Sequence, residues 1–134
     1  MKAKHFKIQE LVDKETYERY GQKAWWFLDN RLIMLLDRLR EDLQRPITVN
    51  NWLWGGNNQH RGLRPPKCNI GADYSQHRFG RAVDFDVKGM KADQVRSYIR
   101  NRINNYPEIK GIETGITWVH LDIRNSDDLL IFKP

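Results

Sequence analysis

Two segments that alternate between apolar and polar side chains constrain the fold of this chain more than any other feature. In residues 81–87, one face carries Val83, Phe85 and Val87 and the other carries Ala82, Asp84 and Asp86. In residues 116–123, the corresponding faces are Val119, Leu121 and Ile123 against Trp118, His120 and Asp122. A period of two is typical of β-strands with one buried face. We therefore expect two strands, each of which contributes its apolar face to a core.

A helical pattern precedes these strands, in residues 15–43. Apolar side chains recur there at intervals of three and four positions: Trp25, Leu28, Leu32, Leu35, Leu36, Leu39 and Leu43. This spacing predicts amphipathic helix, which Gly21 could divide into two. Pro46 lies just beyond the pattern and favours a stop there. Residues 47–50 are β-branched and alternate, so we expect a short strand.

A further helix is predicted over residues 91–104. Val95 and Ile99 lie on its apolar face, and three arginines are expected to face solvent: Arg96, Arg100 and Arg102. A strand-like segment at residues 111–113 follows, and a turn at residues 114–115 leads into the second alternating segment. Helices at one end of the chain and paired strands elsewhere predict an α+β domain.

The length of 134 residues predicts one domain spanning 1–134, with a helical part at 1–45 and a motif-bearing part at 46–134. No apolar run approaches the roughly 20 residues that span a bilayer, so we expect no membrane span. The basic N-terminal segment lacks the apolar stretch of a signal peptide. Cys68 is the single cysteine, which excludes an internal disulfide and a zinc site made of cysteines alone.

The charge balance favours a polyanionic partner. Lys and Arg number 23 against 17 Asp and Glu, which gives a formal net charge of +6. Such a surplus suits nucleic acid, an anionic membrane surface or an anionic cell wall. A nucleic-acid binder would also need a basic patch and a recognised binding motif, and the sequence contains neither. We therefore expect no nucleic-acid partner.

The polar faces of the two alternating segments carry residues that can bind a metal. Asp84 lies on the first segment and His120 on the second. His77 lies seven residues before Asp84, across Gly80, which can turn the chain. If the two strands are neighbours, the three side chains could converge on one point. Two imidazoles and a carboxylate are a common zinc set that leaves a fourth position to water.

Residues 51–75 have no period and are rich in Gly, Asn and Pro. A structureless segment of this length in a small domain is usually functional or disordered, and the Trp and Arg content favours a functional role. Trp52 and Trp54 carry large apolar areas. We expect one of them in the core and the other at the rim of a cleft, with the assignment left open.

The local pattern around the predicted ligands is specific. The segment Ser75-Gln76-His77-Arg78-Phe79-Gly80-Arg81-Ala82-Val83-Asp84 is followed downstream by Trp118-Val119-His120-Leu121-Asp122. It resembles the D-Ala-D-Ala carboxypeptidase family of zinc peptidases (the M15 group), whose signature runs Ser-x-His-x-x-Gly-x-Ala-x-Asp and then His-x-Asp or His-x-His. Upstream, Arg61-Gly62-Leu63-Arg64 resembles the Ser-Gly-Tyr-Arg segment of that family. The resemblance covers about residues 46–125.

The resemblance implies Zn²⁺ as the cofactor, with ligands His77, Asp84 and His120. It implies the fold that these peptidases share with the hedgehog signalling domain, an antiparallel sheet with helices packed on one face. The implied substrates are peptidoglycan stem or cross-link peptides, cut by a D,D-carboxypeptidase or an L-alanyl-D-glutamate endopeptidase. Small members are often bacteriophage or prophage endolysins. We therefore expect a monomer made in the cytoplasm that acts on the wall after release or within a phage particle.

Three further residues are candidates for substrate binding. Arg64 could hold a substrate carboxylate through a bidentate pair, or it could pair with a nearby Asp. Trp118 shares the face of His120 and is expected beside the site. Ser75 is expected to contact substrate or to support a ligand.

The general base is open between Glu113 and Asp122. Many relatives carry an acidic residue three positions before the last His ligand, where this chain has Thr117. We favour Glu113 as the base and Asp122 as a residue that orients a ligand imidazole. This departure also keeps an alternative open, a catalytically inactive binding module of the same fold that zinc stabilises.

Overall fold

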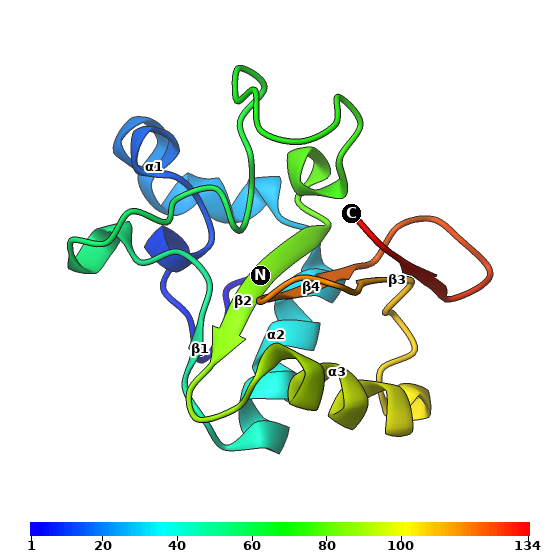
Figure 1. Cartoon of the computed structure of the whole chain (residues 1–134). Coiled ribbons are helices and arrows are strands. Elements are labelled where there is room, and N and C mark those ends of the chain that lie inside the picture. Colours follow the sequence, from blue (N-terminus) through cyan, green and yellow to red (C-terminus); the bar gives the residue numbers. More distant parts are fainter.

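A computed structural model describes all residues 1–134 and shows three α-helices and a five-stranded sheet (Figure 1). The helices are α1 (Lys14–Tyr20), α2 (Asn30–Leu43) and α3 (Ala92–Asn101). The strands are β1 (Ile47–Thr48), β2 (Ala82–Val87), β3 (Gly111–Glu113), β4 (Val119–Asp122) and β5 (Leu130–Phe132). Five 3-10 segments complete the fold: Ile8–Glu10, Gly21–Phe27, Trp52–Trp54, Gln76–Phe79 and Ile103–Asn105. The predicted α+β class is confirmed.

The strand order is β1-β2-β4-β3-β5. All neighbouring strands are antiparallel except β3 and β5, which are parallel. The two alternating segments of the sequence thus became the neighbours β2 and β4 at the centre of the sheet. Strand β5 was not predicted, because its three residues are too few to show a period and its leading residues Leu130 and Ile131 stay exposed.

The long helical pattern is divided near Gly21, which adopts a positive φ of 55° after α1. Residues 21–27 then form a 3-10 segment, and α2 begins where the Asp29 side chain accepts a hydrogen bond from the Arg31 N–H. The α2 helix ends at Leu43, and Gln44 caps it in the left-handed region. The predicted position of Gly21 as a divider is therefore confirmed.

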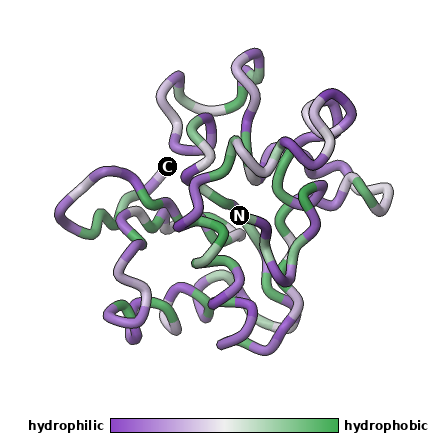
Figure 2. Tube along the Cα trace, turned by 180° about the vertical axis from the view of Figure 1, so that it is seen from behind, coloured by the Kyte–Doolittle hydropathy of each residue, from purple (hydrophilic) through white to green (hydrophobic).

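Helix α2 lies behind the sheet in Figure 1 and buries one apolar stripe: Leu32, Ile33, Leu35, Leu36 and Leu39. These side chains join those of β2, β4 and α3 in one core cluster. Figure 2 shows the hydrophobic segments gathered in the interior and hydrophilic ones in the outer loops. Because one face of the sheet is used for this core, the opposite face of β2 and β4 can carry polar side chains.

Helix α3 corrects one prediction, that Arg96 faces solvent. Arg96 is buried, and its guanidinium donates to the backbone carbonyls of Ile116 and Trp118 as well as to Asp93. The periodicity was misleading because the loop before β4 offers unpaired carbonyls to this side chain, which satisfy its charge and its donors. Arg100 and Arg102 are exposed, as expected.

No helix in the structure combines the length and the apolar character that a bilayer crossing requires.

Candidate metal centre

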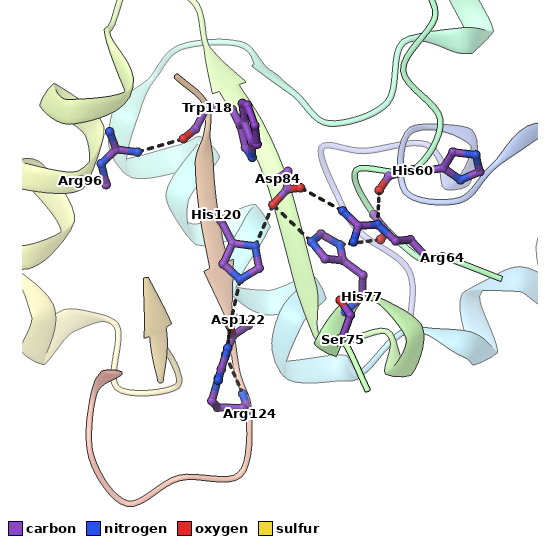
Figure 3. Close-up of polar contacts among 11 residues, drawn as sticks. His60, Arg64, Ser75, His77, Asp84, Arg96, Trp118, His120, Asp122 and Arg124 are labelled. Atoms are coloured by element: carbon purple, nitrogen blue, oxygen red, sulfur yellow. Dashed lines mark hydrogen bonds and ion pairs between the residues drawn. The ribbon is translucent and has the colours of Figure 1, made fainter. Parts of the chain in front are cut away.

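Strand register brings Asp84 and His120 together. They are direct partners across the antiparallel pair of β2 and β4, so their side chains leave the same face of the sheet. The distance between Asp84 Oδ1 and His120 Nδ1 is 2.8 Å, and both side chains are buried (Figure 3). The convergence expected from the two alternating segments is thus present.

His77 reaches the same point from a 3-10 turn, Gln76–Phe79. The Ser75 hydroxyl accepts a hydrogen bond from the His77 N–H and caps this turn. Gly80 ends the turn with a φ of 66°, and a β-carbon there would lie 2.1 Å from the Phe27 carbonyl oxygen. Only glycine fits both constraints. The His77 Nδ1 then lies 2.9 Å from the Gly62 carbonyl, which leaves Nε2 facing Asp84 at 3.3 Å.

The three side chains could hold one metal ion. One ligand atom from each of His77, Asp84 and His120 lies within 4.8 Å of the others. In a tetrahedral zinc site with bonds of about 2.05 Å, neighbouring ligand atoms lie about 3.3 Å apart. The separation between His77 Nε2 and Asp84 Oδ1 already has this value. The pair Asp84 Oδ1 and His120 Nδ1 is closer, at 2.8 Å, which is a hydrogen-bond distance. The donor set therefore fits a zinc ion, and its spacing fits for one pair and would widen for the other.

Arg64 lies against the outer oxygen of Asp84. Its Nη2 is 3.4 Å from Asp84 Oδ2, and its Nε donates to the His60 carbonyl at 2.9 Å. Of the two roles considered for Arg64, the structure thus displays the pairing with a nearby aspartate. Its Nη1 makes no hydrogen bond within the protein and lies next to Gly71. A contact between Arg64 and substrate stays a prediction.

Asp122 lies on the other side of the His120 ring. It is fully buried, and its Oδ2 is 2.9 Å from His120 Nε2. Arg124 donates its Nε to Asp122 Oδ1 at 2.7 Å and its Nη2 to Oδ2 at 2.6 Å. The imidazole therefore stands between two carboxylates, with Nδ1 toward Asp84 and Nε2 toward Asp122.

These contacts shift the ionisation of the metal-free cluster. Burial opposes the charge on His120, but its hydrogen bonds with Asp122 and Asp84 outweigh burial and raise its pKa to about 9. Burial likewise opposes the charge on Asp122, and the hydrogen bonds with Arg124 and His120 prevail and lower its pKa to about 2. The two imidazoles hold the pKa of Asp84 below its ordinary value in the same way. Both carboxylates are thus ionised at neutral pH.

Glu113 lies beside His120 on the side away from Asp84. It is the direct partner of His120 across the antiparallel pair of β3 and β4, so the two residues share a face. Glu113 is half-buried, and its carboxylate makes no hydrogen bond or ion pair within the protein. The candidate base is therefore an unengaged carboxylate next to a candidate ligand.

The remaining candidates lie around this cluster. Trp118 is half-buried, and Figure 3 shows its indole on the side of β4 that faces Asp84. Ser75 caps the turn of His77, which is a supporting contact, and its contact with substrate stays a prediction. Of the two tryptophans in the irregular segment, Trp52 donates its indole N–H to the Val12 carbonyl and is half-buried, whereas Trp54 is exposed.

Sequence reasoning missed Arg124, Gly111 and Phe132. Arg124 could have been noticed as the next member of the polar face, in the spacing His120-x-Asp122-x-Arg124. Gly111 lies opposite Asp122, and a β-carbon there would be 2.3 Å from its Oδ2. Phe132 on β5 touches His120 edge to face, with ring centroids 5.8 Å apart. No local signal marks these two, because their role depends on strand pairing.

The family comparison agrees with this geometry. A family model described as Peptidase M15 matches residues 4–122. The chain belongs to the M15 peptidase family. The match includes all three residues of the possible metal site, and it extends the resemblance seen in the motifs into the N-terminal helices. A search of curated proteins and a search of solved structures each found no significant match.

Proposed function

We propose that this M15 family member is a zinc-dependent peptidase that hydrolyses peptidoglycan stem or cross-link peptides. The observation that carries the proposal is the buried cluster of His77, Asp84 and His120, which presents two imidazole nitrogens and a carboxylate oxygen to one point. The family membership supports peptide hydrolysis as the reaction. The surplus of basic residues suits an anionic wall.

In this proposal, His77 binds zinc through Nε2, His120 through Nδ1 and Asp84 through Oδ1. These are the atoms that face one another, since the other nitrogen of each ring has its own partner. When bound there, Zn²⁺ lowers the pKa of a coordinated water and polarises the scissile carbonyl. The three ligands leave a fourth position of a tetrahedral site free, as a catalytic site requires.

Glu113 is proposed as the general base. Its carboxylate takes a proton from the attacking water while the new C–O bond forms, and it returns that proton to the amine nitrogen when the C–N bond breaks. Two features support this role: Glu113 is the cross-strand partner of His120, and its carboxylate has no other engagement. Asp122 lacks this freedom, because His120 and Arg124 occupy its oxygens.

Substrate binding is proposed at Arg64, Trp118 and Ser75. Arg64 has a free Nη1 donor, which could bind a carboxylate of the peptide. It also lines a cavity of about 610 Å³, but none of the three candidate metal ligands lines that cavity, so the support for substrate binding at Arg64 is its free donor next to Asp84.

The test is mass spectrometry of purified peptidoglycan after digestion. The zinc-loaded protein should generate new peptide termini, a chelator should abolish them, and restored zinc should bring them back. Release of free alanine would indicate a carboxypeptidase, and cleavage after L-alanine an endopeptidase. Glu113→Gln should nearly abolish cleavage, and Glu41→Gln is its matched control. Glu41 is a surface carboxylate paired with His5, far along the sequence from the cluster. If zinc raises the melting temperature and no peptide is cut, the protein is the binding module instead.

A further inference from the structure

A row of small residues on the sheet makes room for a buried ion pair behind His120. Asp122 on β4 has Ala82 as its partner on β2 and Gly111 as its partner on β3. A β-carbon at Gly111 would lie 2.3 Å from Asp122 Oδ2 and 2.4 Å from Oδ1. The Asp122 carboxylate therefore lies over the bare backbone of Gly111, at a place in the row where any larger side chain would displace it.

Arg124 provides most of the hydrogen bonds to this carboxylate. Besides the two guanidinium contacts at 2.7 and 2.6 Å, the backbone N–H of Arg124 donates to Asp122 Oδ1 at 3.3 Å. Its guanidinium lies over the Phe132 ring, 4.9 Å from the centroid, and Phe132 in turn touches His120. Figure 3 shows Arg124, Asp122 and His120 in one line that leads to Asp84.

We propose that Arg124 is a positioning residue for the metal site: through Asp122 it keeps the proton of His120 on Nε2 and directs Nδ1 toward the metal. The inference rests on the proposed function, because it assigns the orientation of a proposed zinc ligand. Metal binding requires the neutral form of His120, and a neutral imidazole has one N–H and one lone pair. An ionised carboxylate accepts hydrogen bonds only, so Asp122 requires the N–H at Nε2, and the lone pair is then left at Nδ1.

Arg124 is needed for two reasons. The bidentate fork fixes the plane of the Asp122 carboxylate, since two parallel N–H groups meet its two oxygens. It also supplies the charge that allows a carboxylate to be fully buried. A lysine would supply the charge without the fork. Orienting partners of this kind usually change metal affinity by about 10- to 100-fold when they are lost.

Arg38 is a matched control for Arg124. Both arginines line the same cavity, both pair with one carboxylate, and their side chains are about equally exposed, 33% for Arg38 and 30% for Arg124. The partner of Arg38 is Glu108, which makes no contact with the metal cluster. If Arg124 had only a structural role, its loss should therefore change zinc affinity no more than the loss of Arg38 does.

The test compares zinc affinity, measured by competition with a chelator, in Arg124→Ala, Arg124→Lys and Arg38→Ala. We expect Arg124→Ala to raise the zinc Kd about 10- to 100-fold, Arg124→Lys to recover only part of the loss, and Arg38→Ala to bind as the wild type does. The visible spectrum of the cobalt-substituted Arg124→Ala protein should also change, since the orientation of a ligand ring changes. Equal zinc affinity in all four proteins would overturn the role of Arg124.

A second readout needs no metal. In the metal-free wild type, NMR should show a slowly exchanging N–H at Nε2 of His120, protected by its bond to buried Asp122 and distinct from the N–H at Nδ1, which faces Asp84. The signal should persist in Arg38→Ala and exchange rapidly in Arg124→Ala. Persistence in Arg124→Ala would overturn the inference without touching the proposed function. Loss of the signal in Arg124→Ala, together with a wild type that binds no zinc, would support the contact and overturn the zinc peptidase.

Discussion

The two halves of the metal cluster are held by different means. The sheet half consists of Asp84, His120 and Glu113 from β2, β4 and β3, where backbone ladders fix which residues stand opposite one another. The loop half consists of His77 and Arg64. These two come from the irregular part of the chain, where there is no ladder: isolated backbone bonds, such as that from the Arg64 N–H to the His77 carbonyl, are supplemented by side chains that donate to backbone carbonyls. The guanidinium of Arg78 alone donates to four carbonyls, those of Pro65, Pro66, Cys68 and Ala72.

This difference indicates where the site is robust. In the sheet half, one residue can change without altering the register of the others, since many backbone bonds set that register. In the loop half, the position of a functional residue depends on a few isolated backbone bonds and side-chain contacts, such as those of His77 with the Arg64 N–H and with the Gly62 carbonyl. We therefore expect substitutions in the sheet half to change chemistry, and substitutions in the loop half to change binding and local order.

Removing one ligand from each half has the largest expected effect. The double variant His77→Ala/His120→Ala should lose essentially all bound zinc, because one ligand remains of the three. Elemental analysis should find one zinc per wild-type chain and almost none in the variant. Equal zinc in the two proteins would remove both histidines from the metal site.

Within the sheet half, Glu113→Gln should keep zinc and fold but lose on the order of 10²-fold or more in kcat, the usual scale for a general base. Asp122→Asn should lose less activity and weaken zinc binding, because it disturbs the partner of His120 Nε2. Steady-state kinetics and zinc content measured on both variants separate the roles. Near-normal turnover in Glu113→Gln beside an inactive, zinc-bound Asp122→Asn would reverse the assignment.

In the loop half, Arg64→Ala should mainly raise KM or lower kcat/KM, and it should also lower stability, because Asp84 and the His60 carbonyl lose their Arg64 donors. Arg64→Lys should not fully rescue it, because lysine lacks the planar fork. Arg78→Ala is the comparison, since it loosens the same loop without removing a contact to Asp84. Wild-type kinetics in Arg64→Ala would exclude a role in binding the substrate carboxylate.

The smallest expected effect lies outside both halves, at the cap of α2. Asp29→Ala should cost about 1 kcal/mol of unfolding free energy at pH 7, the usual value for an N-cap. The hydrogen bond from Arg31 outweighs partial burial and lowers the pKa of Asp29. A lowered pKa stabilises the fold above the ordinary carboxyl pKa, and this contribution is lost as the pH falls through the lowered value. Denaturant titrations at pH 7 and pH 2.5 should show a smaller difference at the lower pH.

The strand patterns allowed much of the sheet half to be predicted. Alternation placed Asp84 and His120 on the non-core faces of two strands, and the motifs added His77 and the family. The predicted solvent face of α3 was wrong at Arg96, because periodicity within a helix contains no information about the carbonyls of a distant loop. Strand β5 was missed for the same kind of reason, since Leu130 and Ile131 gain their partners only from β3.

Side-chain chemistry and a period of two along a strand are enough to indicate which residues can bind metal and which faces they occupy, and the motifs are enough to indicate the family. That β4 lies between β2 and β3, and so that His120 has Asp84 on one side and Glu113 on the other, follows from the fold alone. The fold also decided that Gly111 makes room for Asp122 and that Arg124 holds it there. Strand order and register join residues that are far apart in the chain, and no local pattern encodes which of them will meet.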